Sequence, residues 1–474
     1  MSQSPTADRR GAACVGLTLE WQVMNGAVSL PLDLTELAFA ASGDALVRRT
    51  VLPNGARVLS ERVPGARSAT VGFWVTVGSR DETGADAAHS ASFGSTHFLE
   101  HLLFKGTPSR STLEIAVSFD AVGGEHNAAT SKEYTCYYAK VQDKDLPMAV
   151  EVIGDMITSS LIDPDEFDNE RQVILEELAM ADDDPADAAS EQLYRSVLSG
   201  HPLGRPIGGD PAAIRAATRD GVWQHYRATH RPEHLVIAAA GAVDHDRLVA
   251  DVTAALARGG FADEAAPAPR RPVAPAELGY RPAVVTIQRP VEQVNLFLGV
   301  PGLVATDERR TALAVLNSVL GGGMSSRLFQ EIREKRGLAY SVYSFAAGFA
   351  DAGLFGVYAG CAPHKAPQVV ELARDELARI AEYGITGEEL RRAVGQLSGG
   401  SALALEDSDT RMTRLGRAEI TMGEFADLDE TLRRLALVSA ADVQALAAEF
   451  AAVTPTLAAV GDVAADDFAG VGLR

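Results

Sequence analysis

The stretch Ala239-Ala-Gly-Ala-Val-Asp244 returns near the end of the chain as Ala459-Val-Gly-Asp-Val-Ala464, with its glycine moved from position 241 to position 461. A second pair of stretches has nearly the same spacing. Ile162-Asp-Pro-Asp-Glu-Phe167 and Ile385-Thr-Gly-Glu-Glu-Leu390 each precede a long helical pattern. Two matches at almost one period predict a duplicated domain.

A proline-rich segment separates the two halves. Residues 259–282 contain five prolines among Ala, Glu and Arg, which is typical of a semi-extended linker. We therefore place a first domain at 45–260, a linker at 261–282 and a second domain at 283–474. Residues 1–44 show no strong period and are expected to be an N-terminal extension, either a disordered arm or a mis-assigned start. The folded body is expected to begin near 47–59, where Asn54-Gly55 is typical of a hairpin turn.

Each half alternates strand-like runs with long amphipathic helices, which indicates an α+β fold. Two of the strands follow loops or hairpin-like turns rather than helical crossovers. That favours a mainly antiparallel sheet with helices packed on one face of it. Two such homologous domains joined by a linker predict a clamshell. The expected strands are 69–77, 134–141, 235–240, 293–300, 339–345 and 353–358, and the clearest helices are 147–159 and 366–382.

Composition excludes several classes of partner. The chain has 474 residues and a formal net charge of −21, the wrong sign for binding nucleic acid or an anionic membrane. Its three cysteines, Cys14, Cys136 and Cys361, lie too far apart for a disulfide framework or a paired-cysteine metal site. No early apolar run resembles a secretion signal. We therefore expect a soluble, cytoplasmic protein.

The stretch Gly94-Ser-Thr-His-Phe-Leu-Glu-His-Leu-Leu-Phe-Lys-Gly106 predicts a metal site. Ser95 or Thr96 can cap a helix that Gly106 ends, and His97 and His101 then lie one turn apart on one side. This spacing lets two imidazoles reach one zinc ion, and Glu100 lies where a carboxylate can contact a metal-bound water. The alternative is a helix that carries two histidines by chance.

A catalytic zinc needs a third protein ligand, and the helix expected at 165–180 can supply it. Glu170 and Glu177 are seven residues apart, so they share one face about 10 Å apart along the helix axis. We expect one of them to bind the metal and the other to orient a ligand. The alternative is that both are solvated surface charges. Spacing alone does not distinguish Glu177 from Glu176.

These residues resemble the pitrilysin/insulinase family of zinc peptidases, in the branch that includes bacterial processing-type peptidases and the catalytic subunit of mitochondrial processing peptidase. The resemblance covers roughly residues 45–474. It implies that His97, His101 and Glu177 hold one Zn²⁺ and that Glu100 is the general base. Glu170 then matches the additional acidic residue of the family, which has a supporting catalytic role.

The resemblance extends to the residues that contact substrate. Gly123-Gly-Glu-His-Asn-Ala128, followed by Thr130-Ser-Lys-Glu-Tyr-Thr135, is similar to the edge strand that the family lays beside its substrate. This implies substrate contacts for Asn127 and Ala128. In the second half, Arg333 and Tyr340 match an arginine and a tyrosine that reach the bound peptide and the reacting carbonyl. The segment 81–93 departs from the family pattern in length and contains an extra histidine, His89.

The expected function is therefore that of a zinc metalloendopeptidase that hydrolyses peptide bonds in short or unfolded peptides. The second half contains no His-x-x-Glu-His motif, so we expect one active site and one zinc ion per chain. A homodimer is the expected assembly. One alternative is a non-catalytic core or partner subunit of a heteromeric peptidase-like complex. Another is a metal-storing protein with four protein ligands.

Overall fold

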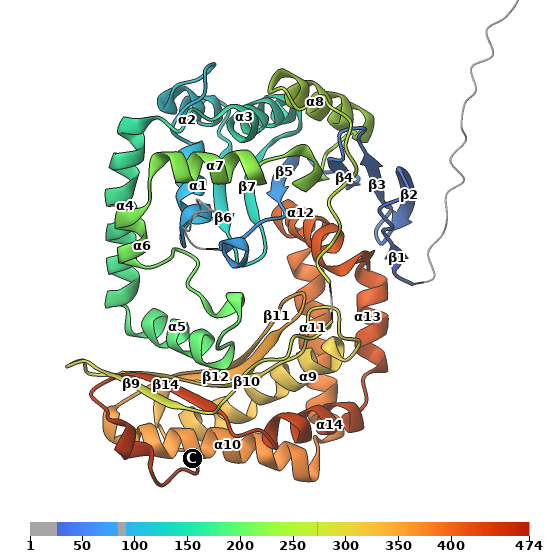
Figure 1. Ribbon diagram of the computed structural model, residues 1–474. Coiled ribbons are helices and arrows are strands. Elements are labelled where there is room, and N and C mark those ends of the chain that lie inside the picture. The colour runs from blue at the N-terminus through green and yellow to red at the C-terminus, as the bar shows by residue number, and fades with distance from the viewer. Residues whose placement is uncertain (1–25, 84–91, 273, 474) are drawn as a thin grey trace, which may run out of the picture.

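The computed structural model describes residues 26–83, 92–272 and 274–473, which form two stacked α+β halves (Figure 1). The first half is built on a seven-stranded sheet in which only the pairing of β4 with β8 is parallel. The strands in order across this sheet are β2 (Glu36–Ala41), β3 (Ala45–Val51), β4 (Arg57–Arg62), β8 (Leu235–Gly241), β5 (Ser68–Val75), β7 (Thr135–Gln142) and β6 (Glu125–Thr130).

The second half repeats the order of the last five of these strands. Its sheet also has a single parallel pairing, that of β9 with β14. Read from that pairing, the strands are β9 (Val284–Gln288), β14 (Thr456–Gly461), β10 (Val294–Pro301), β12 (Gly353–Cys361) and β11 (Ala339–Gly348). The repeated glycines, Gly241 and Gly461, end the equivalent strands β8 and β14, so the duplication and the mainly antiparallel sheets are confirmed.

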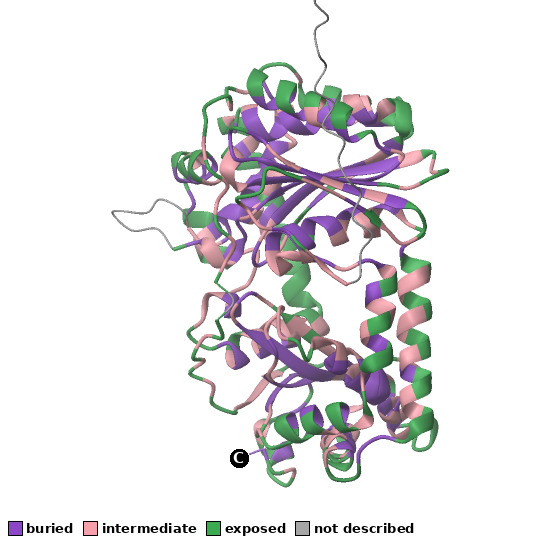
Figure 2. Ribbon diagram, turned by 90° about the vertical axis from the view of Figure 1, so that its right-hand side faces the viewer, coloured by how far each residue is buried: buried purple, intermediate pink, exposed green. Residues whose placement is uncertain are grey.

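Helices cover the outer face of each sheet. Figure 2 shows both sheets as largely buried layers between exposed helical surfaces. On the first sheet the covering helices are α1 (Ser95–Leu103), α3 (Leu146–Ser159) and α8 (His245–Arg258), and on the second they are α9 (Arg310–Gly321), α10 (Ala366–Tyr383) and α14 (Ala440–Ala451). Further helices are α2 (Thr112–Asp120), α6 (Pro211–Ala216), α7 (Arg219–Thr229) and α13 (Leu428–Leu437).

The expectation that helices pack on one face of each sheet is wrong. A helix from each half also packs on the inner face of the sheet in the other half. Helix α4 (Pro164–Asp183) runs from the first half to the second, and α5 (Pro185–Val197), which follows it, packs on β10 and β14 (Figure 1). The equivalent helix α11 (Gly387–Ala404) delivers α12 (Ser408–Arg417) onto β4, β5 and β8. Both inner sheet faces are therefore buried by this exchange.

Glycines on the equivalent strands β5 and β10, at different register positions, face the exchanged helices at close range. A Cβ atom on Gly72 of β5 would lie 2.6 Å from Met412 Sδ of α12, and one on Gly299 of β10 would lie 3.0 Å from Leu193 of α5. On α12 itself, a Cβ on Gly416 would lie 2.5 Å from the ring of Trp74. A Cβ at Gly72 or Gly416 would force the facing side chain to shift, and one at Gly299 would need Leu193 to give by a few tenths of an ångström.

The N-terminal extension needs a correction. Residues 36–41 form β2, which pairs with β3 through the full length of β2, so the first sheet begins before residue 45. Strand β1 (Val28–Ser29) pairs with β13 (Glu424–Phe425) of the second half. One face of β2, with Leu37, Phe39 and Ala41, packs into a core, but three of its six residues are alanine, so the sequence shows little alternation. The part of the predicted extension at 1–25 lies outside the described residues.

The proline-rich linker is irregular, as predicted. The described residues between 261 and 283 form no helix or strand, and their arginines tie the linker to both halves. Arg271 pairs with Asp81 of the first half, and Arg270 pairs with Glu419 of the second. None of the helices in the described ranges combines the length and apolar character that a membrane crossing requires.

Candidate metal centre

A buried carboxylate from outside the motif fixes the start of α1. Glu82 accepts hydrogen bonds from the backbone N–H groups of Gly94 (2.8 Å) and Thr96 (2.7 Å). Burial raises the pKa of Glu82 to about 7, although these two hydrogen bonds favour its charged form. The expected cap from the Ser95 or Thr96 side chain is wrong, because the helix begins after Gly94, which has φ 93° and offers no side-chain cap.

The apolar face of α1 joins it to α4. Phe98 is fully buried and stacks on Phe167 of α4, with ring centroids 4.4 Å apart. Leu99, Leu102 and Leu103 are also fully buried in the core of the first half. The other side of α1, which carries both histidines of the motif, is thereby held against the neighbouring face of α4.

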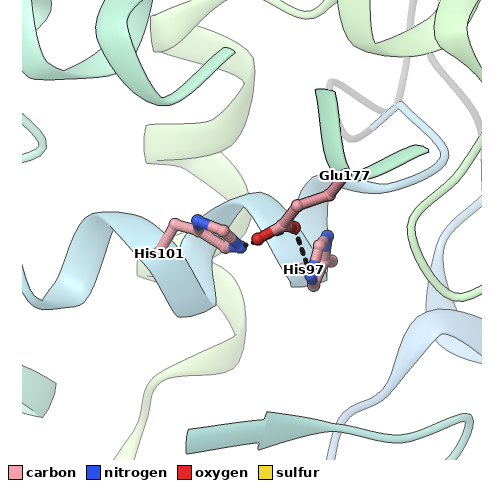
Figure 3. A group of neighbouring side chains, drawn as sticks. All are labelled: His97, His101 and Glu177. Carbon is pink, nitrogen blue, oxygen red and sulfur yellow. Dashed lines mark ion pairs between the residues drawn. The ribbon is translucent and has the colours of Figure 1, made fainter. Parts of the chain in front are cut away.

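The two histidines and Glu177 converge on one point, as Figure 3 shows. Glu177 Oε2 lies 3.3 Å from His101 Nε2 and 3.7 Å from His97 Nε2. One donor atom from each of the three residues lies within 4.8 Å of the others. Two imidazole nitrogens and one carboxylate oxygen form a donor set that zinc accepts in catalytic sites, with a fourth position left for water or substrate.

Glu170 supports this group from the opposite side of His101. It is 5% exposed, and its Oε2 lies 3.0 Å from His101 Nδ1. Because an ionised carboxylate can only accept, His101 Nδ1 donates, which leaves His101 Nε2 free to bind a metal. Lys105 Nζ lies 2.6 Å from the other oxygen of Glu170 and balances its charge. The two carboxylates of α4 therefore lie at different nitrogens of His101, Glu177 beside Nε2 and Glu170 beside Nδ1. Their roles as ligand and orienting group stay a prediction.

The protonation of His97 also fits a metal ligand. Burial, with a smaller contribution from the nearby His101, lowers the pKa of His97 to about 4. The ring is therefore neutral at pH 7, which is the form that coordinates metals. Glu176, the neighbour that spacing did not exclude, is exposed and lies outside the group. The residues present thus fit a zinc ion held by His97, His101 and Glu177.

Glu100 lies between the two histidines on α1 and points toward strand β6. The hydroxyl of Thr130, the last residue of β6, donates a hydrogen bond to Glu100 Oε2. Strand β6 is the edge of the first sheet and pairs only with β7. Asn127 is exposed on this edge, whereas Ala128 packs into the core. The glycine-opened segment predicted to be an edge strand therefore is one, and it ends beside α1.

Arg333 and Tyr340 lie together in the second half. Arg333 belongs to a π-helical turn, Phe329–Glu334, and its guanidinium lies 4.7 Å from the ring centroid of Tyr340 at the start of β11. The Tyr340 side chain is 75% exposed. In the described parts of the chain no hydrogen bond or ion pair joins either residue to the metal group or to Glu100. Their expected contact with a bound peptide stays a prediction.

Two large cavities lie away from the metal group. They have volumes of about 750 and 670 Å³ and are lined by residues of α9, α12 and α13 and their neighbours. Neither is lined by His97, His101 or Glu177. His89, the extra histidine noted in segment 81–93, lies outside the described residues.

Three residues that support the site were not identified from the sequence. Glu82 lies twelve residues before Gly94, and nothing in the sequence around Glu82 indicates that its carboxylate caps α1. Lys105 stands four positions after His101, so it lies on the same face and could have been found from that spacing. Thr130 follows Asn127 and Ala128 in the predicted edge strand, with its side chain on the same side as that of Ala128.

Comparison with known proteins identifies the family. A sequence model described as insulinase, peptidase family M16, matches residues 57–211, and one described as the peptidase M16 inactive domain matches residues 216–397. The chain is 50% identical over 421 residues to an "uncharacterized zinc protease" of Streptomyces coelicolor, a match that covers 88% of this chain and 90% of the relative. A Bacillus subtilis protein of the same description is 37% identical, over 85% of this chain and 95% of its own length.

Solved structures show the same fold. A protease from Helicobacter pylori superposes with a TM-score of 0.76 at 22% identity, over 88% of this chain and 99% of that one. A protein described as a peptidase M16 inactive domain, from Pseudomonas fluorescens, has a TM-score of 0.76 at 20% identity, over 91% and 99%. Since the family models span both halves and the relatives cover most of its length, the chain belongs to the insulinase family, peptidase family M16, whose curated relatives here are described as zinc proteases.

Proposed function

We propose that this protein is a zinc-dependent metalloendopeptidase that hydrolyses peptide bonds in short or unfolded peptides. The observation that carries the proposal is the convergence of His97, His101 and Glu177 on one point. Glu100 lies next to His101 on α1, the helix that carries both histidines. Zinc held by these three residues supplies a Lewis acid that polarises the scissile carbonyl and makes a bound water more acidic. The zinc-protease descriptions of the relatives support the same chemistry.

In this proposal, Glu100 moves the protons. Its carboxylate takes a proton from the attacking water and gives it to the leaving amine, which are the two tasks of a general base that later acts as an acid. Glu170 accepts from His101 Nδ1 and holds that imidazole with its Nε2 toward Glu177. The orientation of the ring is thereby fixed before a substrate arrives.

The substrate would bind as an added strand at the edge of the first sheet. The exposed backbone of β6 at Asn127 and Ala128 can pair with an extended peptide. A short or unfolded chain can adopt the extended conformation that this edge requires, which favours such chains as substrates. Arg333 and Tyr340 would hold the peptide or stabilise the oxyanion from the second half.

The proposal includes a cytoplasmic homodimer that binds neither nucleic acid nor membranes. Cys136 and Cys361 are buried and free, as suits a reducing compartment. The net charge of −21 opposes binding to polyanions. Sedimentation analysis of the purified chain tests the homodimer.

Cleavage of an unstructured fluorogenic peptide tests the proposal. The wild-type chain should cleave it, a chelator should abolish cleavage, and added zinc should restore it. Glu100→Gln should keep its zinc and lose turnover, by about 100-fold or more if Glu100 is the general base. Glu176→Gln is the matched control, since that carboxylate is exposed outside the metal group, and it should cleave like the wild type.

A zinc-loaded wild-type chain without cleavage would instead favour a non-catalytic partner subunit. Full turnover in Glu100→Gln would exclude Glu100 as the base.

A further inference from the structure

Strand β6 presents two different faces at the metal centre. Side chains alternate along a strand, so His126, Ala128 and Thr130 share one face while Glu125, Asn127 and Ala129 share the other. The first face is directed toward the core, where Ala128 is buried and His126 stacks on Phe119 with ring centroids 4.3 Å apart. Thr130 extends this face to the end of the strand, where it meets Glu100 of α1.

The contact between Thr130 and Glu100 has a defined direction. A carboxylate can only accept, so the Thr130 hydroxyl donates its hydrogen to Glu100 Oε2. Within the described ranges, Glu100 has no other hydrogen-bond partner. One carboxylate oxygen is thus held by the strand, and the other remains available for a proton from water.

The hairpin turn that follows Thr130 is anchored on both sides. The turn closes through a hydrogen bond from the backbone N–H of Ser131 to the carbonyl of Tyr134. Glu133 is buried and accepts from Arg80 at 2.6 Å and from the backbone N–H of Ala350, in the second half, at 3.2 Å. Lys132 Nζ donates to the carbonyl of Arg205 at 2.8 Å. Because its flanking turn is fixed in this way, Thr130 has a fixed position from which to hold Glu100.

We propose that Thr130 is a positioning residue that aligns the general base Glu100 with a peptide bound on β6. This inference rests on the proposed peptidase function and goes beyond it, because it links the base to the strand that would carry the substrate. The hydrogen bond fixes one oxygen of Glu100 against the end of the strand that would carry the peptide. The distance between base and peptide, on which turnover depends strongly, is thereby set by β6.

Two substitutions distinguish the effect of the Thr130 hydroxyl from the effect of the side chain's shape. Thr130→Val keeps the branched side chain, which suits a strand, and removes the donor, whereas Thr130→Ser keeps the donor. With rates measured per bound zinc, Thr130→Val should lower kcat by about 10- to 100-fold and leave KM nearly unchanged. Thr130→Ser should restore most of kcat. Thr253→Val, at an exposed hydroxyl on α8 that donates to the carbonyl of Val249, is the matched control and should cleave like the wild type.

A binding measurement separates alignment from substrate capture. In the inactive Glu100→Gln background, Thr130→Val should leave the Kd of a fluorescently labelled peptide unchanged, because the hydroxyl acts on the base and not on the peptide. Zinc content should also be unchanged, since Thr130 does not contact His97, His101 or Glu177.

Three results would overturn the inference. They are a wild-type kcat in Thr130→Val, equal losses in Thr130→Val and Thr130→Ser, and a weaker peptide Kd that accounts for the whole effect. These outcomes differ from a failure of the proposed function, which would appear as wild-type protein without zinc-dependent cleavage or as an active Glu100→Gln variant.

Discussion

Glu177 supplies the only carboxylate of the metal group, and Glu176, one residue earlier, points away from it. Glu177→Gln should therefore weaken zinc binding by more than the roughly 10- to 100-fold typical of losing an outer hydrogen-bond partner. Glu176→Gln should bind zinc like the wild type. Competition with a chromophoric chelator measures both affinities. Equal affinities for the two variants would remove Glu177 from the ligand set.

The burial pattern of α4, which only the structure reveals, bears on the choice that spacing from the histidines left open. Phe167, Glu170 and Ile174 are the buried residues of α4, and they follow one another at intervals of three and four. Continuing that interval by three gives Glu177, not Glu176. The stacking of Phe98 on Phe167 fixes the rotation of α4 and turns these residues toward α1. The two helices are far apart in sequence, so no local pattern predicts this contact.

His245 makes folding stability depend on pH. Burial, assisted by the nearby Arg48, lowers the pKa of His245 to about 4, and the ring is hydrogen-bonded to Thr50 (2.9 Å) and Ser60 (2.8 Å). The unfolded state, with a pKa near 6.5, binds more protons between about pH 4 and 6.5, so stability falls as the pH is lowered through this range. Urea unfolding should show a smaller fall between pH 6.5 and 5 in His245→Gln than in wild type. An identical pH dependence would show that folding does not lower the pKa of His245.

The packing of helix α12 depends on a glycine. Adding a Cβ at Gly416 brings it to 2.5 Å from the buried ring of Trp74, so Gly416→Ala should lower the free energy of unfolding by about 1–3 kcal/mol through overpacking. The matched control is Gly399→Ala on α11, where nothing lies within 4 Å and alanine should stabilise the helix by about 0.5–1 kcal/mol. Thermal unfolding measures both, and a Gly416→Ala variant as stable as Gly399→Ala would contradict the tight seating of α12.

The elements themselves could largely be predicted, whereas their partners could not. Alternation identified the strand at 134–141 as β7, and the repeated stretches correctly marked the ends of β8 and β14. Met412 and Leu415 form the apolar stripe of α12, but such a stripe is the same whichever sheet it covers. The exchange of α5 and α12 between the halves was therefore invisible in the sequence.

Across the whole molecule, buried charge joins the two halves. Glu419 of the second half is fully buried between Arg49 and Arg57 of the first, at 3.4 and 3.5 Å, and also pairs with Arg270 at 2.9 Å. Glu419→Gln would leave these arginines without their counter-charge, so it should lower the free energy of unfolding by about 3–5 kcal/mol.

Glu449→Gln, which breaks only the exposed pair with Arg309, is the control for this variant and should cost less than about 1 kcal/mol. Urea denaturation compares the two. Similar losses would show that the junction between the halves does not depend on Glu419.

The junction also concerns the metal centre, because Glu177 lies on the helix that crosses between the halves. The end of α4 is held by Arg289 of the second half, which pairs with Asp182 at 3.1 Å, and α5 is seated on the second sheet. The half without a metal motif thus helps to position Glu177.

Zinc-edge X-ray absorption of the purified wild-type chain, combined with metal analysis, is the most direct test of the metal centre. The account predicts about one zinc per chain, bound by two imidazoles and by oxygen ligands at about 2.0–2.2 Å, with no sulfur. A chain that retains no stoichiometric metal, or a zinc shell that contains sulfur or lacks the two imidazoles, would contradict it.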